Sequence, residues 1–149
     1  MLTEDEKRFY NRDLTRKGNY SLNIAAKNAG VKKYDKFHNA GYKGLYNGET
    51  ANDMAKRKGL RYREEILDNM GSDELIANLF KISQTEQKLK KDKILGESNA
   101  NNTHYEVGSK IRKTIEELGG NLLENMPTPE KSLKELEKEN KDITIFLSK

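Results

Sequence analysis

Apolar side chains recur at every third or fourth position along most of the chain, which is the spacing of one face of an α-helix. One stripe comprises Leu75, Ile76, Leu79, Phe80 and Ile82, with Leu89 and Ile94 further on, and another comprises Ala100, His104, Val107, Ile111, Ile115 and Leu118. The one candidate strand is the alternating run at 143–147. The pattern predicts an all-α protein, a compact-to-extended bundle of about six helices joined by short turns.

Capping residues and glycines set the expected ends of these helices. Thr3 begins the first helix, which contains a candidate bend at Gly18-Asn19 and stops at Gly30, and Thr128-Pro129-Glu130 begins the last. Between them we expect helices within 32–48, at 51–58, at 62–69, from Ser72 and from Ser98. The 149 residues are expected to form a single domain: a first helix (1–30), a basic corner of short helices (31–71), a long-helix pair with a C-terminal helix (72–138) and a tail (139–149).

The composition indicates a small core under a heavily charged surface. Hydrophobic residues make up 34% of the chain and charged residues 35%, and the mean hydropathy is −1.00. Either the helices are loosely extended or part of the core comes from another molecule. With no cysteine and two histidines, neither a metal site nor another cofactor is expected. No apolar run reaches the roughly 18 residues of a membrane span, and the polar start lacks a signal-peptide pattern, so we predict a cytoplasmic protein.

Positive charge is concentrated in one segment. Residues 31–63 carry nine basic side chains against three acidic ones, a net charge of +6, which leaves about −2 for the rest of the chain. Such a cluster is either a solvated face or a surface that binds nucleic acid or an acidic protein. The candidate binding residues are Lys32, Lys33, Lys36, Lys43, Lys56, Arg57, Lys58, Arg61 and Arg63.

Tyrosines and glycines are interspersed among these cations in GYKGLYNGETANDMAKRKGL, residues 41–60. Tyr42, Tyr46 and Tyr62 are candidates for stacking on exposed bases, and the alternative, which the sequence favours, is that they pack a corner between helices. The glycines at 41, 44 and 48 do not fit a dinucleotide or phosphate-loop motif. They are therefore interpreted as turn residues with positive φ.

The sequence favours neither a helix-turn-helix nor a catalytic site. A helix-turn-helix near residues 50–68 is out of register by one, because its expected apolar positions fall on Glu65 and Asp68. His104 and Glu106 are two residues apart, so on a helix they face different sides and cannot converge on one ion. We therefore expect His104 to be a hydrogen-bonded core histidine, and we expect no catalytic residue and no enzyme activity.

Several motifs occur in an order that is more specific than any one of them. These are NMGS at 69–72, SQTE at 83–86, HYEVG at 104–108 and PTPEKS at 127–132. With them, roughly residues 3–139 resemble the C-terminal half of the DNA-damage-inducible protein D family of bacteria and their phages. The family's usual N-terminal half, which is similar to the domain of phage BRO-type antirepressors, lies outside the resemblance.

The resemblance implies a regulatory role in the SOS response rather than catalysis. Members of this family are regarded as DNA-damage-induced antagonists of RecA-driven recombination. The expected partner is therefore the RecA filament, DNA, or both, with no membrane and no small-molecule cofactor. The alternative is a helical interaction or oligomerisation module of an antirepressor-like DNA-binding regulator, which would pair with a second copy or with the family's other half.

Overall fold

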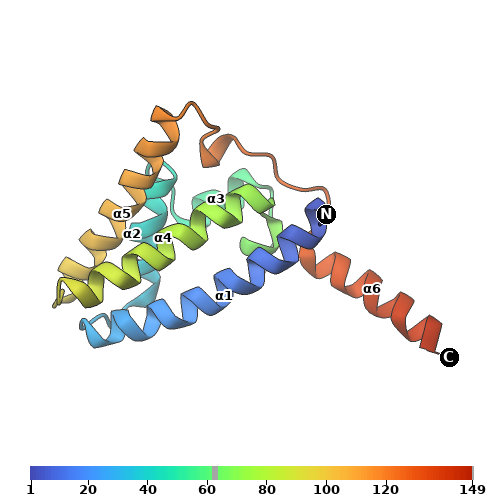
Figure 1. Ribbon diagram of the computed structural model, residues 1–149, viewed down its shortest axis with the longest axis horizontal. Helices are drawn as coiled ribbons and strands as arrows, with labels where there is room; N and C mark the ends of the chain where they lie inside the picture. The colour runs from blue at the N-terminus through green and yellow to red at the C-terminus, as the bar shows by residue number, and fades with distance from the viewer. Residues whose placement is uncertain (62–63, 149) are drawn as a thin grey trace.

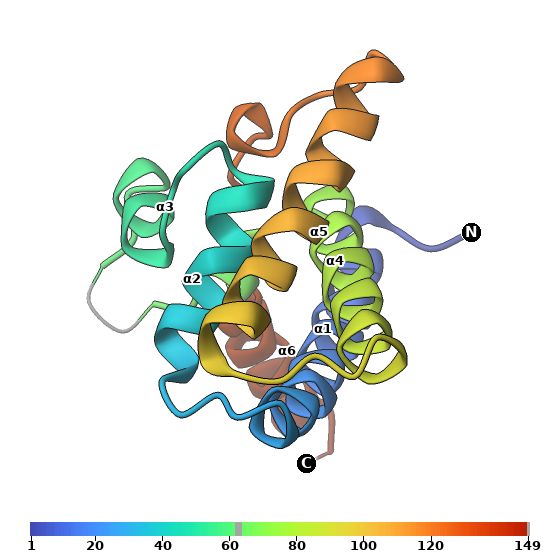
Figure 2. The same ribbon diagram turned by 90° about the vertical axis from the view of Figure 1, so that its left-hand side faces the viewer.

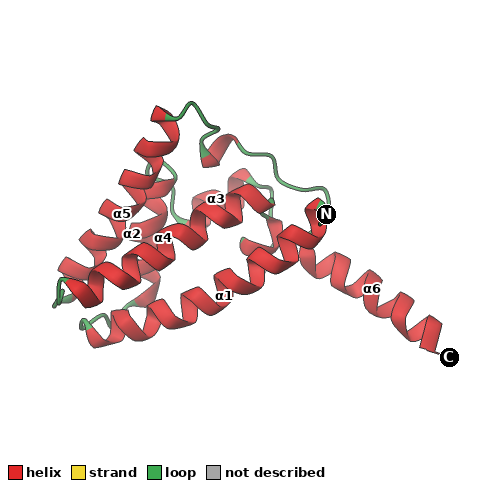
Figure 3. Ribbon diagram, in the orientation of Figure 1, coloured by secondary structure: helices red, strands yellow, loops and turns green. Residues whose placement is uncertain are grey.

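The protein is built of six α-helices in the part of the chain that the computed structural model describes, residues 1–61 and 64–148. Residues 141–148 are described only as part of a helix. The helices are α1 (Glu4–Asn28), α2 (Tyr34–Leu45), α3 (Ala51–Arg57), α4 (Ser72–Lys91), α5 (Glu97–Glu117) and α6 (Leu133–Ser148), with 3-10 helices η1 (Leu67–Asn69) and η2 (Leu123–Asn125). No strand occurs in these ranges (Figure 3), which confirms the all-α prediction.

Two pairs of packed helices form the body of the molecule. α1 packs along α4, α2 packs along α5, and α4 and α5 connect the two pairs through a short loop (Figures 1 and 2). α6 extends away from this body and contacts it at α1 and η1 (Figure 1). None of the described helices is both long and apolar enough to cross a membrane.

The first helix begins and ends where the sequence predicts. The Thr3 hydroxyl accepts a hydrogen bond from the Glu6 amide, the Glu6 carboxylate accepts one from the Thr3 amide, and Gly30 follows the helix with a φ of +100°. Gly18-Asn19 does not break the first helix, because α1 runs through it. A Cβ at Gly18 would lie 3.2 Å from Ile82 Cγ2 of α4, so this glycine serves close packing instead.

One other predicted helix differs from the structure. Within the helix expected at 62–69, residues 62–63 lie outside the described residues, and of the remainder only Leu67–Asn69 are helical, as a 3-10 turn. No second α-helix of a helix-turn-helix follows α3 among the described residues before Ser72.

The last helix begins later than predicted and continues further. Ser132, not Thr128, caps α6, since its hydroxyl accepts a hydrogen bond from the Glu135 amide at 3.1 Å. Residues 127–129 have no regular secondary structure, and the helix begins at Leu133. The candidate strand at 143–147 and most of the predicted tail are part of α6.

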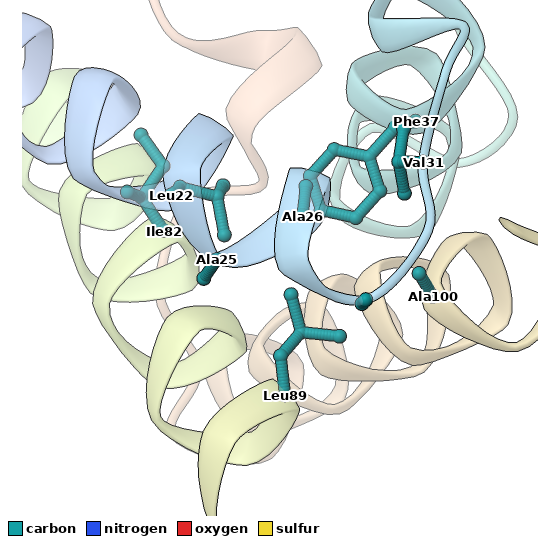
Figure 4. Packing of buried hydrophobic residues seen from close by; sticks show 9 residues of the cluster. Leu22, Ala25, Ala26, Val31, Phe37, Ile82, Leu89 and Ala100 are labelled. Atoms are coloured by element: carbon teal, nitrogen blue, oxygen red, sulfur yellow. The ribbon is translucent and has the colours of Figure 1, made fainter. Parts of the chain in front are cut away.

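A small apolar core joins α1, α2, α4 and α5. Its buried members are mostly short side chains grouped around the fully buried Phe37 and Leu22 (Figure 4). A second cluster lies towards α3 and η2 and contains Leu45, Tyr46, Met54, Met70, Leu75 and Leu123. α4 joins the two clusters, but Ile76 and Phe80, which the sequence pattern assigns to its apolar stripe, remain 49% and 53% exposed.

Glycines bring the backbones of α2 and α5 into contact. A Cβ on Gly44 would lie 2.2 Å from the Tyr105 carbonyl oxygen, and one on Gly108 would lie 2.7 Å from the Gly41 carbonyl oxygen. Gly41 and Gly44 are therefore helix-packing residues, and the interpretation of both as positive-φ turn residues is wrong. Gly48 does adopt a φ of +93°.

The Gly44→Ala variant is expected to lower the free energy of unfolding by at least about 1–3 kcal/mol, because the added methyl meets backbone atoms that cannot move separately. Urea unfolding monitored by circular dichroism measures this loss. Gly18→Ala is the matched control: its methyl would meet side-chain atoms of Ile82 and Leu79, and alanine is favoured over glycine within a helix by about 0.5–1 kcal/mol. Equal losses in the two variants would contradict the close backbone contact.

Candidate nucleic-acid interface

Five of the nine candidate cations form an exposed lysine stripe along α2 and α3. Lys32 and Lys33 precede α2, Lys36 and Lys43 lie on it, and Lys56 lies on α3. All five are exposed, and none forms an ion pair with a carboxylate of the described residues. Because Lys36 and Lys43 are seven residues apart, they lie on the same outward side of α2, separated by about two turns.

Carboxylates lie at both ends of this lysine stripe. Glu97 of α5 accepts hydrogen bonds from the backbone amides of Lys32 and Lys33, and these bonds, with the charges of Lys33 and Lys36, lower the pKa of Glu97. Hydrogen bonds from Thr50, together with the charges of Lys56 and Lys43, lower the pKa of Asp53. Both acids form their hydrogen bonds with backbone amides or with Thr50, so the lysine side chains stay unpaired.

Arg57 and Arg61 are paired with carboxylates and are not counted in the stripe. Arg57 donates from Nε to both carboxylate oxygens of Glu49, at 3.1 and 2.9 Å. Arg61 pairs with Glu64 at 3.1 Å, and Arg63 lies outside the described residues.

The prediction that Lys58 lies on the binding surface is wrong. Its ammonium is fully buried and pairs with the equally buried Glu74 carboxylate at 2.8 Å. Its Nζ also donates to the Asn69 carbonyl oxygen at 3.2 Å. The hydroxyl of Tyr46 donates to the same Glu74 carboxylate, and the Asn78 amide donates to the Tyr46 hydroxyl at 2.9 Å. Lys58 is thus held in a buried network and is not presented to a partner.

The two candidate tyrosines that the structure describes, Tyr42 and Tyr46, pack against the core and are not presented as stacking platforms. Tyr46 is fully buried, and burial with the adjacent Glu74 carboxylate raises its pKa well above 10.0. Tyr42 lies against Lys81, whose Nζ is 4.3 Å from the ring centroid, and burial raises the pKa of Tyr42 to about 12. Tyr62 lies outside the described residues. For the two described tyrosines, the corner-packing interpretation fits the structure.

A buried basic cluster, which the sequence analysis missed, lies where α2, α4 and α5 meet. Lys81 is 2% exposed and pairs with no carboxylate among the described residues, and burial lowers its pKa to about 7. Burial, with the charge of Lys81, lowers the pKa of His38 to about 4. A sequence signal for Lys81 does exist, since it lies at helical spacing among Asn78, Ile82 and Thr85 on the buried side of α4.

His104 lies in the same cluster and is a hydrogen-bonded core residue, as the sequence predicts. Its Nδ1 is 2.9 Å from the Phe37 carbonyl oxygen, and burial lowers its pKa well below 6.5. Its Nε2 lies against Gly41, where an added Cβ would be 2.3 Å away. Among the described residues, no group of three His, Asp or Glu side chains is arranged to hold a metal ion.

Comparison with known proteins gives two matches. Residues 2–136 match the family model described as the DinD C-terminal domain. The chain is 48% identical over 140 residues to DNA damage-inducible protein D of Escherichia coli (strain K12), an alignment that covers 92% of this chain and 51% of that protein. The chain therefore spans about half the length of this curated relative. No solved structure matches.

The Lys58→Met variant is expected to lower the free energy of unfolding by about 3–5 kcal/mol, because it leaves the Glu74 carboxylate buried without its partner. Chemical denaturation at neutral pH measures the change. The Lys56→Met variant, two residues away in sequence and exposed, should change stability by less than about 0.5 kcal/mol. Similar small effects at both positions would show that Lys58 is not held inside.

Stability should rise with pH in two windows, because the unfolded chain binds more protons than the folded one wherever burial lowers the pKa of a base. The first window extends from about 4 to 6.5 for His38, and the second from about 7 to 10.5 for Lys81. Each proton contributes a slope of up to about 1.4 kcal/mol per pH unit. Above pH 10.0 Tyr42 has the opposite effect and lowers stability as the pH rises. Its raised pKa means that the folded chain keeps a proton which the unfolded chain has lost.

Thermal or urea unfolding across this pH range measures both windows. The Lys81→Met variant should lose the upper window and be more stable than the parent near neutral pH, since it no longer buries an amine. An unchanged upper window in this variant would mean that another group is responsible for it.

Proposed function

Because the chain belongs to the DinD C-terminal domain family, we propose that it is a non-enzymatic regulator of the DNA damage response that binds the RecA–DNA filament and antagonises recombination. The lysine stripe is the contact surface in this proposal. The partner comes from the family resemblance, and the mode of contact comes from the electrostatics of α2 and α3.

The observation that supports this function best is the set of exposed, unpaired cations on α2, on α3 and just before α2. Lys32, Lys33, Lys36, Lys43 and Lys56 are exposed, and no described carboxylate neutralises them by direct pairing. A cation that is already in an ion pair has to give up its partner before it can bind a phosphate. Unpaired lysines carry no such cost, so they attract a polyanion more effectively.

The spacing of the stripe suits a nucleic-acid backbone. Lys36 and Lys43 are separated by about 10.5 Å along α2, and successive phosphates of one strand of duplex DNA advance by about 3.4 Å along the helix axis. Lysine is a point charge on a flexible stem, which contacts phosphates without reading base edges. The stripe would therefore bind without regard to sequence, as an inhibitor of filaments formed on any DNA requires.

The Lys36→Glu/Lys43→Glu/Lys56→Glu variant is expected to lose binding to DNA and to RecA–DNA filaments, as measured by fluorescence anisotropy. If five lysines each meet a phosphate, the affinity of the parent protein should fall on the order of 10²- to 10³-fold between roughly 50 and 200 mM salt. A matched control carries Glu at Lys7, Lys17 and Lys27, three exposed lysines of α1.

A RecA strand-exchange assay separates the regulatory role from binding alone. The parent protein and the α1 control should inhibit exchange, and the stripe variant should not. Inhibition that survives loss of the stripe would contradict the proposed surface. Salt-sensitive DNA binding without any effect on exchange would contradict the proposed role.

A further inference from the structure

An apolar groove runs between α4 and α5 and is separate from the lysine stripe. α4 and α5 diverge from the loop that joins them (Figure 1), and the groove between them has a volume of about 680 Å³. On α4 it extends from Ile76 to Lys91, and on α5 from Glu106 to Ile115. Fifteen residues of helix correspond to about 22 Å, or four turns.

The lining of the groove includes large apolar side chains that the fold leaves in contact with water. Ile76 and Phe80 of α4 are 49% and 53% exposed. Val107, Ile111 and Ile115 of α5 lie opposite them across the groove. Large apolar side chains grouped on an exposed surface mark a site of interaction with another molecule.

The edges of the groove carry an excess of unpaired positive charge. Lys88 is already paired with Asp92 at 3.0 Å. Lys91 on the α4 wall and Lys110 on the α5 wall form no ion pair with a described carboxylate, and Glu106 on the α5 wall forms none with a described cation, so the unpaired charges of the lining sum to +1. An occupant of the groove therefore meets apolar surface at its centre, a cation on the α4 wall, and a cation and a carboxylate on the α5 wall.

We propose that this groove binds an amphipathic helix of a partner protein, with its apolar side chains between α4 and α5 and acidic side chains facing Lys91 and Lys110. Two diverging helices with an apolar lining form the kind of groove that accepts a third helix through anchors at i, i+3 or i+4, and i+7. The apolar lining disfavours nucleic acid, and the unpaired lysines select an acidic helix over a basic one.

Two designed helical peptides test the proposal. Each has about 15 residues with Leu at the anchor positions, and they differ only in having Glu or Lys at the flanking positions. Fluorescence anisotropy of the labelled peptides with the full chain should show at least about 10-fold tighter binding of the Glu peptide. Equal affinity, or no binding by either peptide, would overturn the proposal.

Variants of the chain locate the binding surface. Ile76→Glu and Phe80→Glu should each weaken binding of the Glu peptide about 10-fold or more. Ile24→Glu is the matched control, because Ile24 lies on α1 and has the same 49% exposure as Ile76. Circular dichroism verifies that each variant is folded, and an Ile24→Glu effect equal to that of Ile76→Glu would overturn the assignment.

A charge exchange supplies a second, independent outcome. The Lys91→Glu/Lys110→Glu variant should reverse the preference and bind the Lys peptide more tightly than the Glu peptide. The groove could instead be occupied by a second copy of this chain, and light scattering tests this by measuring whether the chain is a monomer or a dimer. A dimer that the Phe80→Glu variant dissociates would overturn the proposal in favour of self-association.

Discussion

The direct contact between the backbones of α2 and α5 is the constraint on which the rest of the structure depends. Gly44 lies against the Tyr105 carbonyl, Gly108 lies against Gly41, and the His104 ring covers Gly41. At such short range α2 cannot rotate about its axis without a steric clash. Its tyrosines are therefore held towards the core while its lysines remain on the outside, so one helix serves both packing and the proposed binding surface.

Polar side chains do much of the packing that a chain with so few hydrophobic residues cannot supply with apolar ones. Arg8 donates to the carbonyl oxygens of Met70, Asp68 and Lys131, which ties α1 to two distant loops. The Lys58–Glu74 pair joins α3 to α4. Removal of one partner of a buried pair leaves an uncompensated charge inside the protein, so these networks disfavour other arrangements of the helices.

The two proposed surfaces differ in chemistry and are carried by different helices. The lysine stripe on α2 and α3 combines mobile charges with little apolar area, which suits a polyanion of any sequence. The groove between α4 and α5 combines apolar walls with two cations, which suits a folded peptide segment. A protein with both surfaces could contact a nucleoprotein filament and a second protein at the same time.

The sequence by itself determined the helical class and most helix ends, because capping bonds and helical periodicity are local. It also determined that His104 belongs to the core, since that residue shares the apolar stripe of α5. Only the tertiary structure decided which cations are available: Lys56 and Lys58 are two residues apart, yet one is exposed and the other pairs with Glu74. The same applies to the packing glycines, whose role depends on a neighbouring helix that is distant in sequence. Burial and pairing are properties of the folded arrangement, and a local pattern cannot contain them.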